Sequence, residues 1–177
     1  MKEFKLKDDK ILLVRELDKN DAKDVLKYLK KVGGETDFLT FGKDGLPYTV
    51  DQEKVVLKNI QNAERDFMMG GLIGGNLVSI GNISSFSKER LKYKGELGIS
   101  VLKKYWGVGV GSIMMEYLIN LCKTKNFRKI NLIVYENNKR AINLYKKFGF
   151  EIEGLLSRDV YINSIFYSSY QMGLKLD

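Results

Sequence analysis

A strand, a glycine-rich loop and an amphipathic helix follow one another without a gap between Glu96 and Cys122. Apolar residues alternate along the strand from Leu97 to Val101 and recur at helical spacing after Ile113. The loop glycines, which have no Cβ and so allow tight turns and a close approach to a ligand, are Gly107, Gly109 and Gly111. Because the free N–H groups of a helix's first turn favour an anion, this stretch predicts an anion-binding loop.

Three known glycine loops compete for this pattern. The phosphate loop of nucleoside triphosphatases ends in Gly-Lys-Ser/Thr, but here Ser112 and Ile113 follow Gly111 directly. The dinucleotide-binding fingerprint needs glycine or alanine at the position of Ser112, and an acid about 20 residues further on. Residues 126–131 contain no acid. The missing residues therefore exclude both of these loops.

The third loop binds acetyl-CoA in the GNAT superfamily of N-acyltransferases and reads Arg/Gln-x-x-Gly-x-Gly/Ala. The stretch from Trp106 to Gly111 resembles it, with Trp106 in place of Arg or Gln. Downstream, the segment from Asn138 to Phe150 resembles the second signature of that family, Asn-x-x-Ala-x-x-Leu-Tyr-x-Lys-x-Gly-Phe. With two motifs in the family's order, the chain from Ile11 to Leu176 resembles a GNAT N-acetyltransferase.

The order of the expected elements favours an α+β fold in a single domain over residues 1–177, with residues 1–10 as an N-terminal extension. We expect a mixed, mostly antiparallel sheet of about seven strands flanked by about four helices. This is also the order of elements in the GNAT fold. The resemblance implies, in addition, that the strand before the glycine loop and the strand after the long helix splay apart and admit the pantetheine arm of the cofactor.

Local signals predict several element boundaries. The first helix is expected to end at Gly33-Gly34. A capping-box pattern predicts a second helix from about Val50 to Ala63. The long loop between them, Gly33 to Tyr48, carries acids and aromatic residues, and we expect it to influence the choice of acceptor. The last two strands, Phe150 to Leu156 and Val160 to Leu174, are expected to form an antiparallel pair.

The composition excludes several kinds of chemistry. With no histidine and one cysteine, the chain lacks the usual metal-ligand sets, the Ser/His and Cys/His nucleophile pairs and an internal disulfide. Cys122 lies on an apolar helix stripe and is expected to be buried and inert. The net charge of +8 comes from scattered lysines without a nucleic-acid motif, so no nucleic-acid partner is expected. No apolar run is long enough for a membrane helix or a signal peptide, which predicts a cytoplasmic protein without a membrane partner.

The resemblance implies a site for acetyl-CoA and none for a metal. The backbone amides of the loop up to Ser112 are expected to bind the pyrophosphate, and Asn138 the pantetheine arm while it also caps a helix. The residues expected to bind the cofactor are Ile99, Val101, Leu102, Lys103, Trp106, Gly107, Val108, Gly109, Val110, Gly111, Ser112, Asn138, Ala141 and Tyr145.

The sequence leaves more than one interpretation for the catalytic and acceptor-binding residues. In the family pattern Tyr145 is the general acid that protonates the thiolate of CoA, although its helical stripe also fits core packing. Glu96 lies on the strand before the loop, where it is either a general base or a solvated strand residue. Acids are expected at the entrance for a cationic acceptor, and the candidates are Glu35, Asp37 and Glu136.

The combination Tyr105-Trp106-Gly107 resembles the branch that includes polyamine, amino-acid and ribosomal-protein N-acetyltransferases. The expected function is therefore transfer of the acetyl group of acetyl-CoA to a primary amine of a small molecule, by direct attack in a ternary complex. Two alternatives stay open: acetylation of the N-terminal α-amine of a ribosomal or other protein, and a CoA-binding module without catalysis. A homodimer is one option for the assembly.

Overall fold

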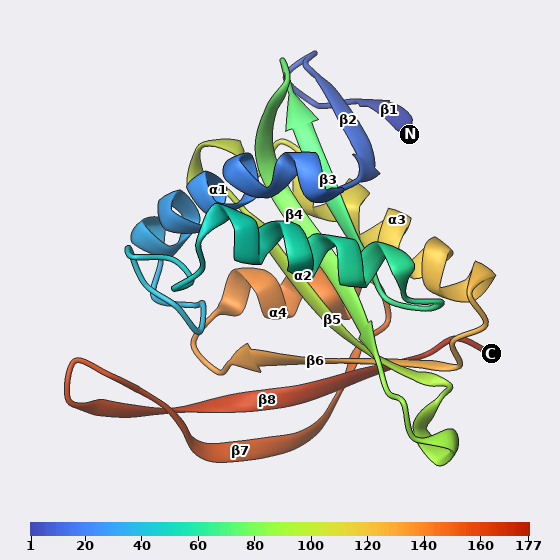
Figure 1. The fold of residues 1–177 in the computed structure, drawn as a ribbon. Helices are drawn as coiled ribbons and strands as arrows, with labels where there is room; N and C mark the ends of the chain where they lie inside the picture. Colours follow the sequence, from blue (N-terminus) through green and yellow to red (C-terminus); the bar gives the residue numbers. More distant parts are fainter.

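An eight-stranded sheet organises residues 1–177, all of which the computed structural model describes (Figure 1). The strands are β1 (Lys2–Lys5), β2 (Ile11–Glu16), β3 (Phe67–Ile73), β4 (Asn76–Ser85), β5 (Lys94–Val101), β6 (Lys129–Tyr135), β7 (Glu151–Ile162) and β8 (Ile165–Lys175). Their order in the sheet is β1-β2-β3-β4-β5-β6-β8-β7. Every neighbouring pair is antiparallel except β5 with β6, which is parallel. The expected mixed, mostly antiparallel sheet is confirmed.

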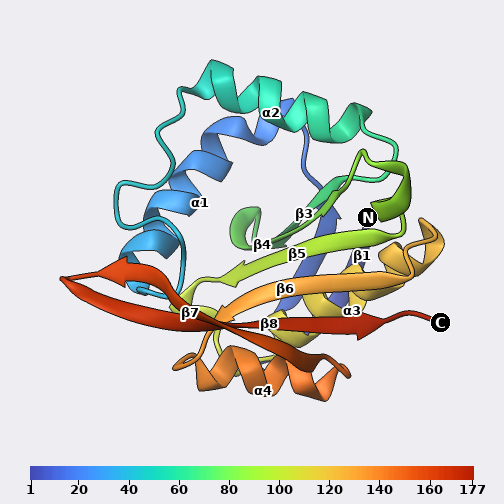
Figure 2. The ribbon, with the colours of Figure 1, turned by 90° about the horizontal axis from the view of Figure 1, so that it is seen from below.

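Four α-helices cover the sheet from both sides (Figure 2). They are α1 (Ala22–Glu35), α2 (Val50–Asn62), α3 (Val110–Thr124) and α4 (Lys139–Lys147). Helices α3 and α4 contribute to the larger apolar core, which includes the fully buried Cys122, and α1 and α2 to a smaller core on the opposite face. No helix combines the length and the apolar character that crossing a membrane requires.

Side-chain caps begin two of these helices where the sequence predicts them. The Thr49 hydroxyl accepts a hydrogen bond from the Gln52 N–H, and the Gln52 side chain accepts one from the Thr49 N–H, which completes the capping box of α2. Asn138 caps α4 by accepting a bond from the Ala141 N–H. These bonds satisfy backbone donors that the first turn of a helix leaves free.

The parallel junction between β5 and β6 is short, and the two strands then separate. Only the first three residues of β5, from Lys94 to Glu96, pair with β6. Beyond this point the two strands do not pair with each other, which leaves Leu97 to Val101 of β5 and Leu132 to Tyr135 of β6 apart. The splay implied by the family resemblance is therefore present, and it leaves a strand edge open inside the sheet.

Residues 1–10 are more than an extension, because they add the eighth strand. β1 pairs with β2 from Lys2 to Lys5, and Leu6 is buried in the larger core. The Lys7 N–H donates to the Val108 carbonyl in the glycine loop at 3.1 Å. Sequence reasoning missed this strand because it is short and mostly charged.

The prediction that α1 ends at Gly33-Gly34 is wrong, since the helix continues to Glu35. A Cβ atom at Gly33 would lie 2.2 Å from the Gly42 carbonyl oxygen. Glycine is therefore required at this position by the loop that crosses the helix, and does not terminate it. The connection between α1 and α2 consequently starts at Thr36.

The turn of the last hairpin also differs from the prediction. It lies at Asn163 and Ser164, whose φ values of 49° and 64° are those of a two-residue hairpin turn. The expected break between Leu156 and Val160 is instead an irregularity within β7, where Arg158 has a φ of 53°. The strand continues through this bulge, so the hairpin is longer than expected.

Candidate active site

A cavity of about 1340 Å³ connects the start of α3 with the space beneath α1 and α2. Its walls come from the glycine loop, the separated parts of β5 and β6, α4, and the loop between α1 and α2. Pockets for single small ligands usually measure about 300–1,000 Å³. The cavity is thus larger than this range, and it runs through the gap between β5 and β6.

The glycine-loop end of the cavity has the features of an anion site. Gly109 is the N-cap of the 15-residue helix α3 and has a φ of 109°, and Gly107 has a φ of 81°. No atom lies within 4 Å of a Cβ built at Gly107, and only one Leu6 methyl, at 4.0 Å, approaches a Cβ built at Gly109. A ligand can therefore come close to this backbone at the positive end of α3.

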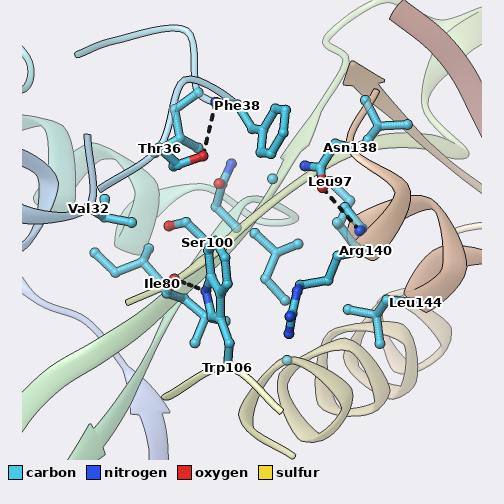
Figure 3. A pocket seen from close by; sticks show the side chains of 18 of the residues that line it. Val32, Thr36, Phe38, Ile80, Leu97, Ser100, Trp106, Asn138, Arg140 and Leu144 are labelled. Carbon is cyan, nitrogen blue, oxygen red and sulfur yellow. Dashed lines mark hydrogen bonds between the residues drawn. The ribbon is translucent and has the colours of Figure 1, made fainter. Parts of the chain in front are cut away.

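Trp106, where the family loop has Arg or Gln, fastens the loop to the sheet. Its indole N–H donates to the Val101 carbonyl at 2.7 Å, and the Arg140 guanidinium lies 4.9 Å from the ring centre. Trp106 and Arg140 both line the cavity and lie close together in Figure 3. A cation thus stands beside the loop although position 106 itself carries no charge.

Helix α4 carries the second motif into the same cavity. The Asn138 side chain accepts from the Ala141 N–H at 3.2 Å, as the dashed line in Figure 3 shows. Tyr145 is buried, packs on the Phe150 ring with 5.9 Å between centres, and also lines the cavity. Burial raises the pKa of Tyr145 to about 12. A phenol is protonated at neutral pH even at its ordinary pKa of about 10, and burial keeps Tyr145 in this form.

The connection between α1 and α2, residues 36–49, reaches across the splay to β6. Phe38 meets the Tyr135 ring edge-to-face, with 6.2 Å between centres, and the Tyr135 hydroxyl donates to the Leu39 carbonyl at 3.2 Å. Within this connection the Phe38 N–H donates to the Thr36 hydroxyl, and both side chains border the cavity (Figure 3). The α1–α2 connection therefore forms one wall of the cavity and is joined to β6.

Most of the residues expected to bind the cofactor line this single cavity. The exceptions are Leu102, Lys103 and Val110. Leu102 and Val110 are buried in the two cores instead, whereas Lys103 is exposed. Glu96 is also exposed and outside the cavity lining, at the last paired position of β5 with β6.

The acids expected at the acceptor entrance do not line the cavity either. The Glu35 carboxylate accepts a hydrogen bond from the Lys103 N–H at 2.7 Å, which ties α1 to the chain after β5. Glu136 is partly buried just after β6, and Asp37 is exposed in the loop. Burial, followed by the carboxylates of Asp159 and Asp37, raises the pKa of Tyr135, so both acids lie near that ring.

Sequence reasoning missed two acids that do line the cavity, Glu53 on α2 and Asp159 on β7. The Glu53 side chain is 2% exposed, and its buried Oε2 has no hydrogen-bond partner. Burial raises the pKa of Glu53. A signal was available, because Glu53 lies four residues before the buried Leu57 and thus on the apolar stripe of its helix. Asp159 lies in the bulge that the hairpin prediction misplaced.

Known proteins match this chain in sequence and in fold. An acetyltransferase of the GNAT family from Streptococcus pneumoniae has a TM-score of 0.90 and 31% sequence identity, over 93% of this chain and 99% of that one. A GNAT superfamily phosphinothricin acetyltransferase from Sinorhizobium meliloti, solved in complex with acetyl-CoA, has a TM-score of 0.81 at 16% identity, over 93% of this chain and 88% of that one.

Among curated relatives, the L-amino acid N-acetyltransferase AaaT of Escherichia coli (strain K12) is 32% identical over 101 residues. The match covers 56% of this chain and 62% of that enzyme, which is less than two thirds of its length. The family model described as the acetyltransferase (GNAT) family matches residues 37–150, which include both motifs of the cavity. By this match the chain belongs to the acetyltransferase (GNAT) family.

Proposed function

We propose that this protein transfers the acetyl group of acetyl-CoA to a primary amine of a small molecule, by direct attack in a ternary complex. The observation that carries the proposal is the continuous cavity through the splay of β5 and β6. An anion site lies at one of its ends, and the other end is walled mostly by apolar side chains. Such a cavity can hold both substrates at once, so that the amine and the thioester meet at the splay without a covalent enzyme intermediate.

The residues present fit acetyl-CoA. The open backbone at Gly107 and Gly109 and the first turn of α3 suit a pyrophosphate. The unpaired edge of β5 from Leu97 to Val101 offers backbone groups to the amide-rich pantetheine arm. Bound there, acetyl-CoA would supply an acetyl group activated as a thioester. Lys7 and Arg140, which line the cavity at this end, add positive charge for the phosphates.

The reaction also requires proton transfers, from the acceptor amine and to the departing thiolate. The acceptor ammonium loses a proton to water, and the free amine forms a C–N bond with the acetyl carbon as the C–S bond breaks. The new amide nitrogen gives up a second proton to water, and the departing thiolate takes up one proton. Tyr145, a phenol that is protonated at neutral pH, gives its proton to the thiolate in this proposal. We assign no general base to Glu96, whose side chain lies outside the cavity.

A small acceptor is favoured over a peptide by the connection between α1 and α2. Its contacts with Tyr135 on β6 hold it across the splay, whereas an extended peptide needs an open groove. Phe38 and Leu39 make these contacts and also line the cavity. Acetylation of a protein N-terminus therefore remains the second choice.

A thiol-release assay with acetyl-CoA tests the proposal. The acceptor panel contains polyamines, amino acids, arylalkylamines, aminoglycosides and peptides with free N-termini. We expect turnover with at least one small amine, and a fall of about 10²–10⁴-fold in kcat for Tyr145→Phe with unchanged acetyl-CoA affinity. The control is Tyr161→Phe, since Tyr161 is 61% exposed on the hairpin. CoA binding without turnover on any amine would contradict the proposal. Full activity of Tyr145→Phe would show that Tyr145 has only a packing role.

A further inference from the structure

Charged side chains are unevenly distributed along the cavity. The basic ones come from the N-terminal segment and from α4, and they are Lys5, Lys7, Lys139, Arg140 and Lys147. The opposite end, which we call the acceptor chamber, is formed by α1, α2, their connection and the adjoining β3 and β4. Typical lining residues of this chamber are Leu29, Phe38, Phe41, Val56, Met68 and Ile80. Among the residues that these elements contribute, Glu53 is the only charged one.

Glu53 has no partner within the protein. The side chain is 2% exposed, its Oε2 is buried without a hydrogen bond, and none of the ion pairs of the structure includes it. A buried carboxylate without a partner is strongly unfavourable for the folded state, whereas an apolar side chain at this position would not be. The position of Glu53 in the first turn of α2 offsets part of this cost.

We infer, on the basis of the proposed function, that Glu53 binds the ammonium group of the acceptor. The same geometry indicates that the acceptor is a primary amine with an apolar body and no carboxylate. A cation is the partner that the Glu53 carboxylate lacks. The apolar and aromatic walls of the chamber suit a hydrocarbon or aryl group.

The same walls select against two other classes of amine. The carboxylate of an amino acid would enter the chamber without an arginine or lysine to pair with it. The second ammonium of a polyamine would find no second acid among the chamber residues. Asp159, the other acid of the cavity, is exposed on β7, so water would weaken its pairing with an ammonium. Both classes of amine would therefore lose binding energy relative to an apolar monoamine.

Three acceptors of different charge test the inference: 2-phenylethylamine, L-phenylalanine and spermidine. We expect the highest kcat/KM with 2-phenylethylamine. Glu53→Gln should raise its KM about 10²-fold, because the buried charge pair is lost, and leave the KM for acetyl-CoA unchanged. The control Asp51→Asn removes a carboxylate from the same helix whose side chain is 89% exposed, and it should match the wild type. A preference for L-phenylalanine or spermidine, or an unchanged KM in Glu53→Gln, overturns the inference.

Calorimetric binding of 2-phenylethylamine in the presence of CoA separates this inference from the proposed function. If the wild type binds the amine, Glu53→Gln does not, and no amine is acetylated, the inference stands and the proposed function fails. If the wild type does not bind it, the inference fails whatever other amines are acetylated. The Tm of Glu53→Gln should equal or exceed that of the wild type, because an unpaired buried charge is removed. A lower Tm would assign Glu53 a structural role and overturn the inference.

Discussion

Two neighbouring glycines in α1 give a matched pair of variants. A Cβ atom at Gly33 would lie 2.2 Å from the carbonyl oxygen of Gly42 and 3.0 Å from the Phe41 ring. At Gly34 the nearest atom would be the Lys43 Cβ, at 3.5 Å, which is ordinary contact. The two positions therefore differ mainly in how closely the connection between α1 and α2 approaches the helix.

The expected magnitudes have opposite signs. Alanine is favoured over glycine inside a helix by about 1 kcal/mol, and somewhat less near its end. Gly34→Ala should therefore raise the Tm by up to about 2–4 °C. At Gly33 the loop has to move by about 1 Å, and overpacking of this kind costs about 1–3 kcal/mol. Gly33→Ala should consequently unfold several degrees below Gly34→Ala.

The displacement of the loop in Gly33→Ala should also affect acceptor binding. Phe41 lines the acceptor chamber, so Gly33→Ala should raise the KM for the acceptor and leave the KM for acetyl-CoA unchanged. Differential scanning calorimetry and steady-state acetyl transfer measure both effects. If Gly33→Ala matched Gly34→Ala in Tm and in acceptor KM, the connection would not be held against α1 as the structure shows.

Two further outcomes are expected elsewhere in the molecule. Gly109→Trp should abolish acetyl-CoA binding, as measured by calorimetry. The substitution places a ring at the N-terminus of α3 and a side chain at a φ of 109°, which L side chains rarely adopt. Undiminished affinity for acetyl-CoA would refute the anion site. Cys122 should react with iodoacetamide at pH 8 only after the protein is unfolded in urea. The side chain is fully buried, and burial raises the pKa of its thiol to about 12. Fast labelling of the folded protein would contradict the burial of Cys122.

Much of the fold follows from short-range patterns. The capping box of α2, the Asn138 cap and the glycine loop before α3 each involve residues a few positions apart, and each element forms where its pattern predicts. The errors involve contacts between distant segments. Whether Gly33 ends a helix or admits the Gly42 backbone depends on where the loop crosses, which local sequence does not encode.

The same contrast between local patterns and distant contacts applies to the candidate site. Loop glycines expose backbone regardless of side-chain direction, so the motif could predict that Gly107, Gly109 and Gly111 line the cavity. The acids Glu35 and Asp37 were chosen for their charge and for the loop around them, but charge does not determine which way a side chain points. Glu53 was identifiable in principle, because helical periodicity places it on the inward face of α2. Its role depends on the chamber that four separate elements build.

The brief pairing of β5 with β6 also has a mechanical consequence. Three residue pairs, from Lys94 to Glu96, are the only ladder that joins the β1–β5 part of the sheet to the β6–β8 part. This seam is where the sheet should open first, and amides beside it should exchange hydrogen fastest among the central strands. A substrate that fills the splay would bridge the two parts, so binding should slow this exchange on both sides of the seam together.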